Sequence, residues 1–266
     1  MPSIVDASNS VIAIFRKELR GYFTSPIAYV VAAAFWILAG FFFVNFVVQA
    51  VNISQQFDVF NQPGQTFDAP MEVSRRFLSL LGTLSLFILP SLTMGLYAEE
   101  RRRGTMELLA TSPITNLAVA VGKWLAVLVY YITLLIPLLA YQVLAYSSTR
   151  PMMDYRQMLF GYLGLVLMAG SVMALGLFVS SLTDSTLVAA VGTFGIVLLL
   201  WVIDAAAGQN QGILADALRH LSLLQQFGSW VQGVVSTSSL VLFLSMIVLG
   251  LFLTVQSVEA LRWQQN

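Results

Sequence analysis

A strongly polar stretch divides the chain at residues 99–113, and it reads Glu99-Glu100-Arg101-Arg102-Arg103-Gly104-Thr105-Met106-Glu107-Leu108-Leu109-Ala110-Thr111-Ser112-Pro113. Six of these residues are charged, whereas the flanking segments 77–98 and 117–146 hold one charged residue between them, Lys123. The chain is 58% apolar and only 10% charged, against roughly 45–50% and about 25% in soluble domains. This contrast predicts a polytopic membrane protein in which the polar stretch is a loop between two spans.

Six segments are apolar enough and long enough to cross a bilayer, for which about 20 residues are needed. They are residues 27–48, 77–98, 117–146, 158–181, 186–203 and 238–258. Pro90 lies inside the second span and predicts a kink there, because proline removes a helical hydrogen bond. The composition and pattern therefore predict one all-α transmembrane domain over residues 1–266.

An amphipathic helix is predicted at residues 10–24, before the first span. Its polar face carries Arg16, Lys17 and Arg20, and its other face is aliphatic and aromatic, including Tyr22 and Phe23. This pattern is typical of a helix lying in the membrane interface. A helix packed on soluble protein has the same pattern, so that alternative stays open.

Residues 204–237 are too short and too polar to span the bilayer. They begin with Asp204 and a Gly208–Gly212 turn, and then show apolar residues at helical spacing. We expect an outer helical hairpin here, either re-entrant or lying in the interface.

Six spans place both termini on the same side as the loop at residues 99–116. That side holds eight Lys and Arg residues and the other side holds five. Because cytoplasmic loops are enriched in Lys and Arg, the loop and both termini are predicted to be cytoplasmic. Lys123 lies within about two turns of the loop, so we expect it to reach the interface by snorkelling; the alternative is a substrate-binding lysine.

The sequence offers little for catalysis or for an energy source. It has no Cys and a single histidine, His220, which falls in the outer hairpin. It has no glycine-rich phosphate loop of the G-x-x-x-x-G-K-[ST] type, and its spans lack the acidic groups that coupled carriers use. The net charge is zero, which does not favour nucleic acid as a partner. We therefore expect no catalysis, no metal and no cofactor in this chain.

The loop itself has the pattern of a short helical element. Glu99 can pair with Arg102 or Arg103, and Glu100 with Arg103, at helical spacing, which extends the second span as a helix. Gly104 breaks this helix, and Thr105 can cap a second one at residues 106–110, which Pro113 ends. Such an element can dock into a groove of another protein; the alternative is a solvated loop that only sets the topology.

The loop pattern, followed by Gly122-Lys123-Trp124, resembles the ABC type-2 permease family. Residues 16–29 are similar to the entry helix of that family. Residues 221–227 and 233–235 are similar to the outer hairpin of its gliding-motility-type branch, to which the resemblance is closest.

The resemblance implies a transmembrane permease subunit of an ATP-driven ABC transporter, an exporter in a bacterial cytoplasmic (inner) membrane. Two permease chains, as a homodimer or heterodimer, would assemble with two ATP-binding subunits, which would hold ATP and Mg. The ATP-binding subunit would dock on the loop at 99–116 and push on it and on the entry helix. The loop residues implicated are Glu99, Glu100, Arg101, Arg103, Gly104, Thr105, Glu107, Leu108 and Pro113. Those of the entry helix are Arg16, Lys17, Glu18, Arg20, Tyr22 and Phe23.

Two other classes of function fit the composition. A stand-alone secondary carrier or channel would move substrate without an ATP-binding subunit, although it would need ionisable groups along its path. A membrane scaffold would anchor a cytoplasmic partner through the same loop and move no substrate. The substrate is not encoded in any motif of the chain.

Overall fold

The computed structural model describes residues 4–60, 68–106, 114–147, 155–207 and 220–264. Within these residues all regular secondary structure is α-helical. The helices are α1 (Ile4–Thr24), α2 (Pro26–Phe60), α3 (Ala69–Thr93), α4 (Ala98–Arg102), α6 (Asn116–Ser147), α7 (Tyr155–Leu182), α8 (Thr186–Ala207), α10 (Leu223–Val231) and α11 (Thr237–Gln264).

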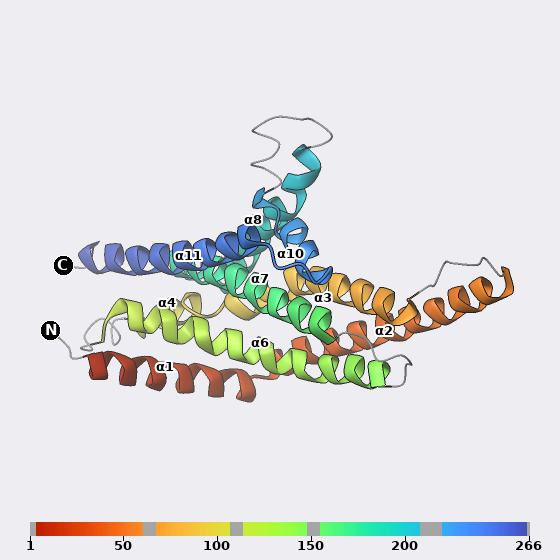
Figure 1. Cartoon of the computed structure of the whole chain (residues 1–266). Helices are drawn as coiled ribbons and strands as arrows, with labels where there is room; N and C mark the ends of the chain where they lie inside the picture. Colours follow the sequence, from red (N-terminus) through yellow and green to blue (C-terminus); the bar gives the residue numbers. More distant parts are fainter. Residues whose placement is uncertain (1–3, 61–67, 107–113, 148–154, 208–219, 265–266) are drawn as a thin grey trace.

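Six candidate membrane spans are present in the described residues, which confirms the predicted all-α membrane class. Their apolar segments are Pro26–Gln56, Ala69–Arg102, Asn116–Val143, Tyr155–Leu182, Thr186–Ile203 and Thr237–Ala260. Both termini lie at the same end of the bundle, and α8 leans away from the other helices (Figure 1). An even number of spans requires this placement of the termini.

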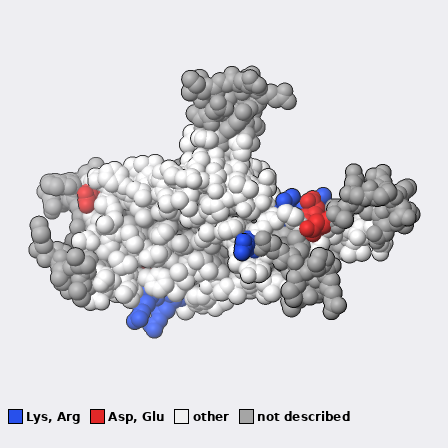
Figure 2. All heavy atoms as spheres, viewed as in Figure 1, with Lys and Arg blue, Asp and Glu red and all other residues white. Residues whose placement is uncertain are grey.

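The surface has the character of a protein embedded in lipid. Figure 2 shows charged side chains toward the two ends of the bundle and an uncharged surface over most of the region between them. Large apolar side chains are freely exposed on the spans, including Ile37 at 70% and Leu187 at 72%. In water such a surface would aggregate, so the chain is a multi-pass membrane protein.

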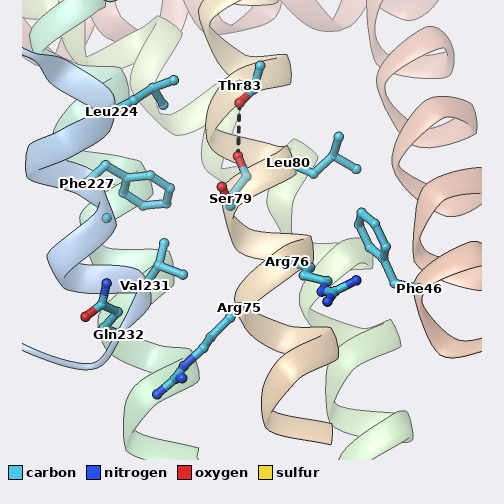
Figure 3. Close-up of a pocket in the computed structure, with 11 residues that line it drawn as sticks. Phe46, Arg75, Arg76, Ser79, Leu80, Thr83, Leu224, Phe227, Val231 and Gln232 are labelled. Atoms are coloured by element: carbon cyan, nitrogen blue, oxygen red, sulfur yellow. Dashed lines mark hydrogen bonds between the residues drawn. The ribbon is translucent and has the colours of Figure 1, made fainter. Parts of the chain in front are cut away.

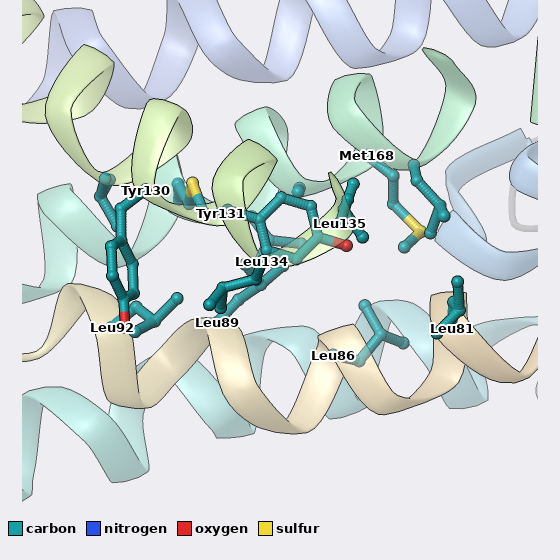
Figure 4. Close-up of a cluster of buried hydrophobic side chains, with 14 of the residues drawn as sticks. Leu81, Leu86, Leu89, Leu92, Tyr130, Tyr131, Leu134, Leu135 and Met168 are labelled. Carbon is teal, nitrogen blue, oxygen red and sulfur yellow. The ribbon is translucent and has the colours of Figure 1, made fainter. Parts of the chain in front are cut away.

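Helix α7 is the centre of the bundle. About 67% of its spanning segment is buried, against 22% for α2 and 17% for α8. One side of α7 meets α3 and α6 through a cluster of buried leucines, tyrosines and methionine, in which Leu86, Leu89, Tyr131 and Met168 interdigitate (Figure 4). Tyr131 and Ser85 share a hydrogen bond of 2.6 Å inside this cluster.

Small residues let the neighbouring helices approach α7 closely, as is common for helices packed in lipid. A Cβ atom added at Gly250 of α11 would lie only 2.6 Å from the backbone carbon of Ala174. A Cβ atom at Gly164 would lie 2.6 Å from Cβ of Trp230 on α10. The backbones of α7 and α11 are therefore in direct contact.

We expect Gly250→Ala to lower the free energy of unfolding by about 1–3 kcal/mol, because the added methyl group must displace backbone atoms. Gly195→Ala is the matched control, since nothing lies within 4 Å of its new Cβ. In a helix interior that change is neutral or stabilising by up to about 1 kcal/mol. Thermal unfolding in detergent micelles measures both variants. Equal midpoints for the two alanine variants would show that α7 and α11 are not packed this closely.

Helix α3 begins and ends with recognisable signals. Asp68 accepts a hydrogen bond from the backbone N–H of Met71 at 3.2 Å and caps the helix. Pro90 lies inside the last turn, and α3 ends at Thr93. A turn at residues 94–97 separates it from α4. The helix predicted to run unbroken from the second span into the loop is therefore interrupted, one turn after the proline.

Helix α10 is the main described element of the predicted outer hairpin, whose first residues, 204–207, belong to α8. Ser222 caps its start, accepting from the backbone N–H of Gln225 at 3.4 Å, and Gly233 (φ +79°) follows its end. Its apolar face, Leu223, Phe227, Trp230 and Val231, is buried, and α10 packs on α7 and α3. The re-entrant or interfacial placement of this hairpin is not confirmed, and residues 208–219 lie outside the described part of the chain.

Helix α1 runs alongside the N-terminal half of α6 (Figure 1). A Cβ atom at Gly122 of α6 would lie 3.0 Å from Cβ of Ile14 and 3.1 Å from the backbone oxygen of Val11. The predicted amphipathic helix is present, with Arg16 and Arg20 exposed. Its predicted position in the plane of the interface is not confirmed, because it packs lengthwise on a spanning helix.

Candidate functional site

The start of α4 is held by a serine from α7. Tyr97 occupies the N-cap position of α4, and its own side chain makes no capping bond. Ser180 Oγ instead accepts hydrogen bonds from the backbone N–H groups of Tyr97 (3.0 Å) and Ala98 (3.1 Å). It donates to the backbone oxygen of Met94 at 2.9 Å. One buried hydroxyl therefore satisfies three backbone groups where α3 gives way to α4.

The end of α4 has the geometry of a Schellman motif. Gly104 has φ +69°, a conformation that favours glycine. Its N–H donates to the oxygen of Arg101 at 3.0 Å, and the N–H of Thr105 donates to the oxygen of Glu100 at 3.1 Å. This confirms that Gly104 ends the helix, because these two bonds redirect the chain away from the helix axis.

Two side-chain interactions of α4 bind it locally and to α7. Arg103 pairs with Glu99 at the predicted i,i+4 spacing. Arg101 donates to the backbone oxygen of Ser181, the last but one residue of α7, at 2.8 Å. The predicted pairing of Glu100 with Arg103 does not occur, because Glu100 faces a different set of cations.

Lys123 of α6 lies at the centre of the site. Its side chain is 1% exposed, and its ammonium lies 3.0 Å from Glu18 of α1 and 3.0 Å from Glu100 of α4. It also donates to the backbone oxygen of Leu96 at 2.7 Å and lies 5.1 Å from the centre of the Tyr97 ring. The prediction that Lys123 snorkels to the interface is therefore wrong: its charge is satisfied inside the protein.

Lys17 pairs with the same two carboxylates from the exposed side. Its ammonium lies 3.1 Å from Glu100 and 3.5 Å from Glu18. We call Lys17, Glu18, Glu100 and Lys123 the ion-pair cluster; its two cations balance its two carboxylates. It joins α1 to α4 and α6, which lie far from α1 in the sequence.

Lys17 remains charged at physiological pH. Burial lowers the pKa of its ammonium, but Glu100 and then Glu18 raise it, and the net effect raises the pKa above its ordinary value. A raised lysine pKa gives a stabilising contribution that is complete below the ordinary value of 10.5. This contribution is lost only when the pH rises through the raised pKa.

The end of α1 is fixed to the spans by aromatic residues. Tyr22 donates to the backbone oxygen of Leu92 on α3 at 2.5 Å and stacks on Tyr130 of α6, with ring centroids 4.9 Å apart. Phe23 meets the same ring edge-on, and Tyr130 donates to the backbone oxygen of Ala28 at 2.8 Å. A displacement of α1 must therefore also displace α3 and α6.

The structure brings together part of the predicted site. Lys17 and Glu18 of the entry helix meet Glu100 of the loop in the ion-pair cluster. Tyr22 is held by α3 and Arg101 by α7, whereas Arg16 and Arg20 are exposed. Gly104 and Thr105 form the exposed turn after α4. The remaining predicted site residues, Glu107, Leu108 and Pro113, lie outside the described part of the chain. Of the short helix predicted at residues 106–110, only Met106 is described.

Sequence reasoning missed the roles of Lys123 and Ser180. A single lysine in a long apolar helix indicates a buried ion pair, because a buried cation must be paired. The sequence does not show which carboxylates pair with it, since Glu18 and Glu100 are separated from it by 105 and 23 positions. Ser180 carries no comparable signal, because serine is common among the small residues of α7.

No group of three or more His, Cys, Asp or Glu side chains that could hold a metal ion occurs in the described ranges. The site therefore consists of ion pairs and backbone hydrogen bonds between helices. Such an arrangement can transmit a displacement from one element to another, and the exposed turn after α4 is the point at which it meets the surface.

The comparison with known protein families identifies the family of the chain. A family model described as an ABC-2 family transporter protein matches residues 48–255. This segment includes α4, Lys123 and all of the spans except most of α2 and the end of α11. No curated protein matches the chain. Because the match covers well over half of the sequence, the chain belongs to the ABC-2 family of transporter proteins.

Proposed function

We propose that this chain is the transmembrane subunit of an ATP-driven exporter, energised by a separate ATP-binding subunit that docks on the loop at residues 99–116. Family membership makes it a permease component of an ABC transporter. The observation that carries the proposal is the ion-pair cluster, because it ties the loop to α1 and α6 at once. ATP and Mg then belong to the partner, and this chain contributes no catalytic group.

The contacts of α4 determine how a push on the loop would travel. Ser180 and Arg101 join α4 to α7, and Glu100 joins it to Lys123 of α6 and Lys17 of α1. A force applied to the exposed turn at residues 102–105 therefore reaches three long helices. The aromatic contacts of Tyr22 carry the displacement of α1 further, into α3.

The orientation in the membrane follows from charge. The ion-pair cluster, the exposed arginines of α4 and both termini share one end of the bundle (Figure 1). By the positive-inside rule, we assign this end to the cytoplasm of a bacterium and the chain to its inner membrane. The ATP-binding subunit would approach from there.

A second permease chain, either a copy of this one or a related chain, completes the assembly in this proposal. The two least buried spans, α2 and α8, support it, because only 22% and 17% of their apolar segments are covered by the rest of the protein. These spans are free to meet a second chain, and rearrangement of that contact would open a path outward.

We expect Glu99→Lys to reduce co-purification of the ATP-binding subunit at least tenfold, because a docking surface is sensitive to reversed charge. The double variant Glu99→Lys/Arg103→Glu keeps the pair within α4 but inverts the charges shown to a partner. This double variant should lose co-purification of the ATP-binding subunit to the same extent as Glu99→Lys. The measurement is Mg-dependent ATP hydrolysis in the eluate when the tagged chain is purified from its own cells.

The control is Arg156→Glu at the opposite end of the bundle, which should retain full ATPase. Restored docking in the double variant would show that Glu99 and Arg103 only stabilise α4 and do not face the partner. Wild-type docking in both loop variants would contradict the proposal. ATPase missing from the eluate of the wild type would contradict it too, and would favour a stand-alone carrier, which moves substrate in vesicles without ATP, or a scaffold, whose partner shows no ATPase.

A further inference from the structure

A groove lies at the end of the bundle away from the ion-pair cluster, where α3 runs between α2 and α10. It has a volume of about 570 Å³. Leu224, Phe227 and Val231 of α10 line one side, and Phe46 of α2 lies on the other (Figure 3). Leu80, Ser79 and Thr83 of α3 lie between them. Most of this surface is therefore apolar.

Two arginines close one end of the groove. Arg75 and Arg76 lie in the second turn of α3, with Arg75 directed toward the α10 side and Arg76 toward Phe46 (Figure 3). The uncharged run 77–98 begins directly after them. We therefore expect their guanidinium groups at the boundary between headgroups and acyl chains, to which long basic side chains reach.

The two arginines differ in their partners. Arg76 donates to Glu72 at 2.6 Å and to Gln49 at 3.5 Å, so its charge is balanced within the protein. Arg75 forms no ion pair with any carboxylate of the described residues, and its Nε is buried without a hydrogen-bond partner. Buried donors are nearly always satisfied in folded proteins. This one therefore indicates an acceptor that the described residues do not provide.

We propose that this groove binds an anionic amphiphile whose phosphate lies on Arg75 and whose acyl chain lies along the apolar wall. A guanidinium matches the oxygens of a phosphate group. Gln232 lines the same end of the groove and offers an amide to the rest of the headgroup. The chain would run from the arginines past Leu80 toward Leu224 and Thr83. The proposal does not depend on ATP-driven transport.

The test compares lipids that share acyl chains but differ in net charge. The purified full chain in detergent micelles is incubated with phosphatidylglycerol or phosphatidylcholine, and retained lipid is counted by native mass spectrometry. We expect the wild type to retain phosphatidylglycerol at least tenfold more tightly. Arg75→Gln should abolish this preference. Arg156→Gln, which removes a charge at the same end of the bundle but outside the groove, should preserve it.

A second variant keeps both arginines and fills the groove. Ser79 is exposed and lines the groove, so Ser79→Trp adds an indole without removing any buried group. It should weaken retention of phosphatidylglycerol at least tenfold. This variant decides the question if Arg75→Gln fails to fold.

Equal losses in the Arg75 and Arg156 variants would overturn the proposal, since they would indicate non-specific attraction to charge. Unchanged retention in Ser79→Trp would overturn it as well. Inorganic phosphate and glycerol phosphate distinguish a lipid from a soluble phosphate compound. If either displaces the lipid at equal concentration, the acyl chain contributes nothing and the site binds phosphate alone.

Discussion

Replacing Lys123 by methionine is expected to lower the free energy of unfolding by about 3–5 kcal/mol, the range for breaking a buried ion pair by removing one partner. Methionine fills a similar volume, so the change removes the charge with little effect on packing. Glu18 and Glu100, whose side chains are only 17% and 14% exposed, are left with Lys17 as their one cation. The backbone oxygen of Leu96 loses its donor as well.

Two further variants show whether the effect of Lys123→Met depends on the burial of Lys123 and on its pairing with Glu100. Lys17→Met removes a cation from the same cluster, but the Lys17 side chain is 67% exposed, so the expected loss is below about 1 kcal/mol. Lys123→Met/Glu100→Gln leaves one cation and one carboxylate. It should be more stable than the sum of the two single variants predicts, by about 0.5–3 kcal/mol.

Chemical unfolding in mixed detergent micelles measures the wild type, the three single variants and the double variant. Additive effects of Lys123→Met and Glu100→Gln would contradict direct pairing between the two side chains. A loss for Lys17→Met as large as that for Lys123→Met would show that burial does not set the energetics of the cluster.

The spans were the most predictable part of this protein. Length and apolar composition alone decide whether a segment crosses a bilayer, and all six predicted spans have their counterparts in α2, α3, α6, α7, α8 and α11. The end of α4 at Gly104 was predictable too, because glycine adopts positive φ at little cost. These features depend on neighbouring residues in the sequence.

The partners of Lys123 were not predictable in this way. They depend on how α1 packs along α6, and the backbone of α1 fits there because Gly122 has no side chain. The same holds for Ser180, whose hydroxyl meets α4 only after α7 and α3 have packed together. Tertiary contacts of this kind bring distant residues together, and local patterns do not encode them.

The second large effect is expected for Ser180→Ala. Its hydroxyl is 0% exposed and is the hydrogen-bond acceptor for the backbone N–H groups of both Tyr97 and Ala98. Each buried donor left unsatisfied costs about 1–3 kcal/mol. We therefore expect Ser180→Ala to lower the free energy of unfolding by more than an ordinary serine substitution does. The weakened contacts lie at the junction of α3 and α4.

Ser181→Ala is the matched control on the same helix. Ser181 is also buried, but its hydroxyl donates only to the backbone oxygen of Phe178, within α7, at 2.7 Å. Its loss leaves no backbone N–H unsatisfied, so we expect only the loss of one ordinary hydrogen bond, about 0.5–1.5 kcal/mol. Thermal unfolding of the two variants in the same detergent provides the comparison. Equal midpoints would show that Ser180 does not hold the start of α4.

The Ser180 variant also tests how the loop acts on the spans. If α4 transmits force because it is anchored to α7, then releasing its first turn should uncouple ATP hydrolysis from transport even where the ATP-binding subunit still docks. Reconstituted complexes carrying Ser180→Ala should therefore hydrolyse ATP while moving less substrate per ATP, whereas Ser181→Ala complexes should keep the wild-type ratio. An unchanged ratio in both would place transmission in the remaining contacts of α4, which are those of Arg101 with the end of α7 and of Glu100 with Lys17 and Lys123.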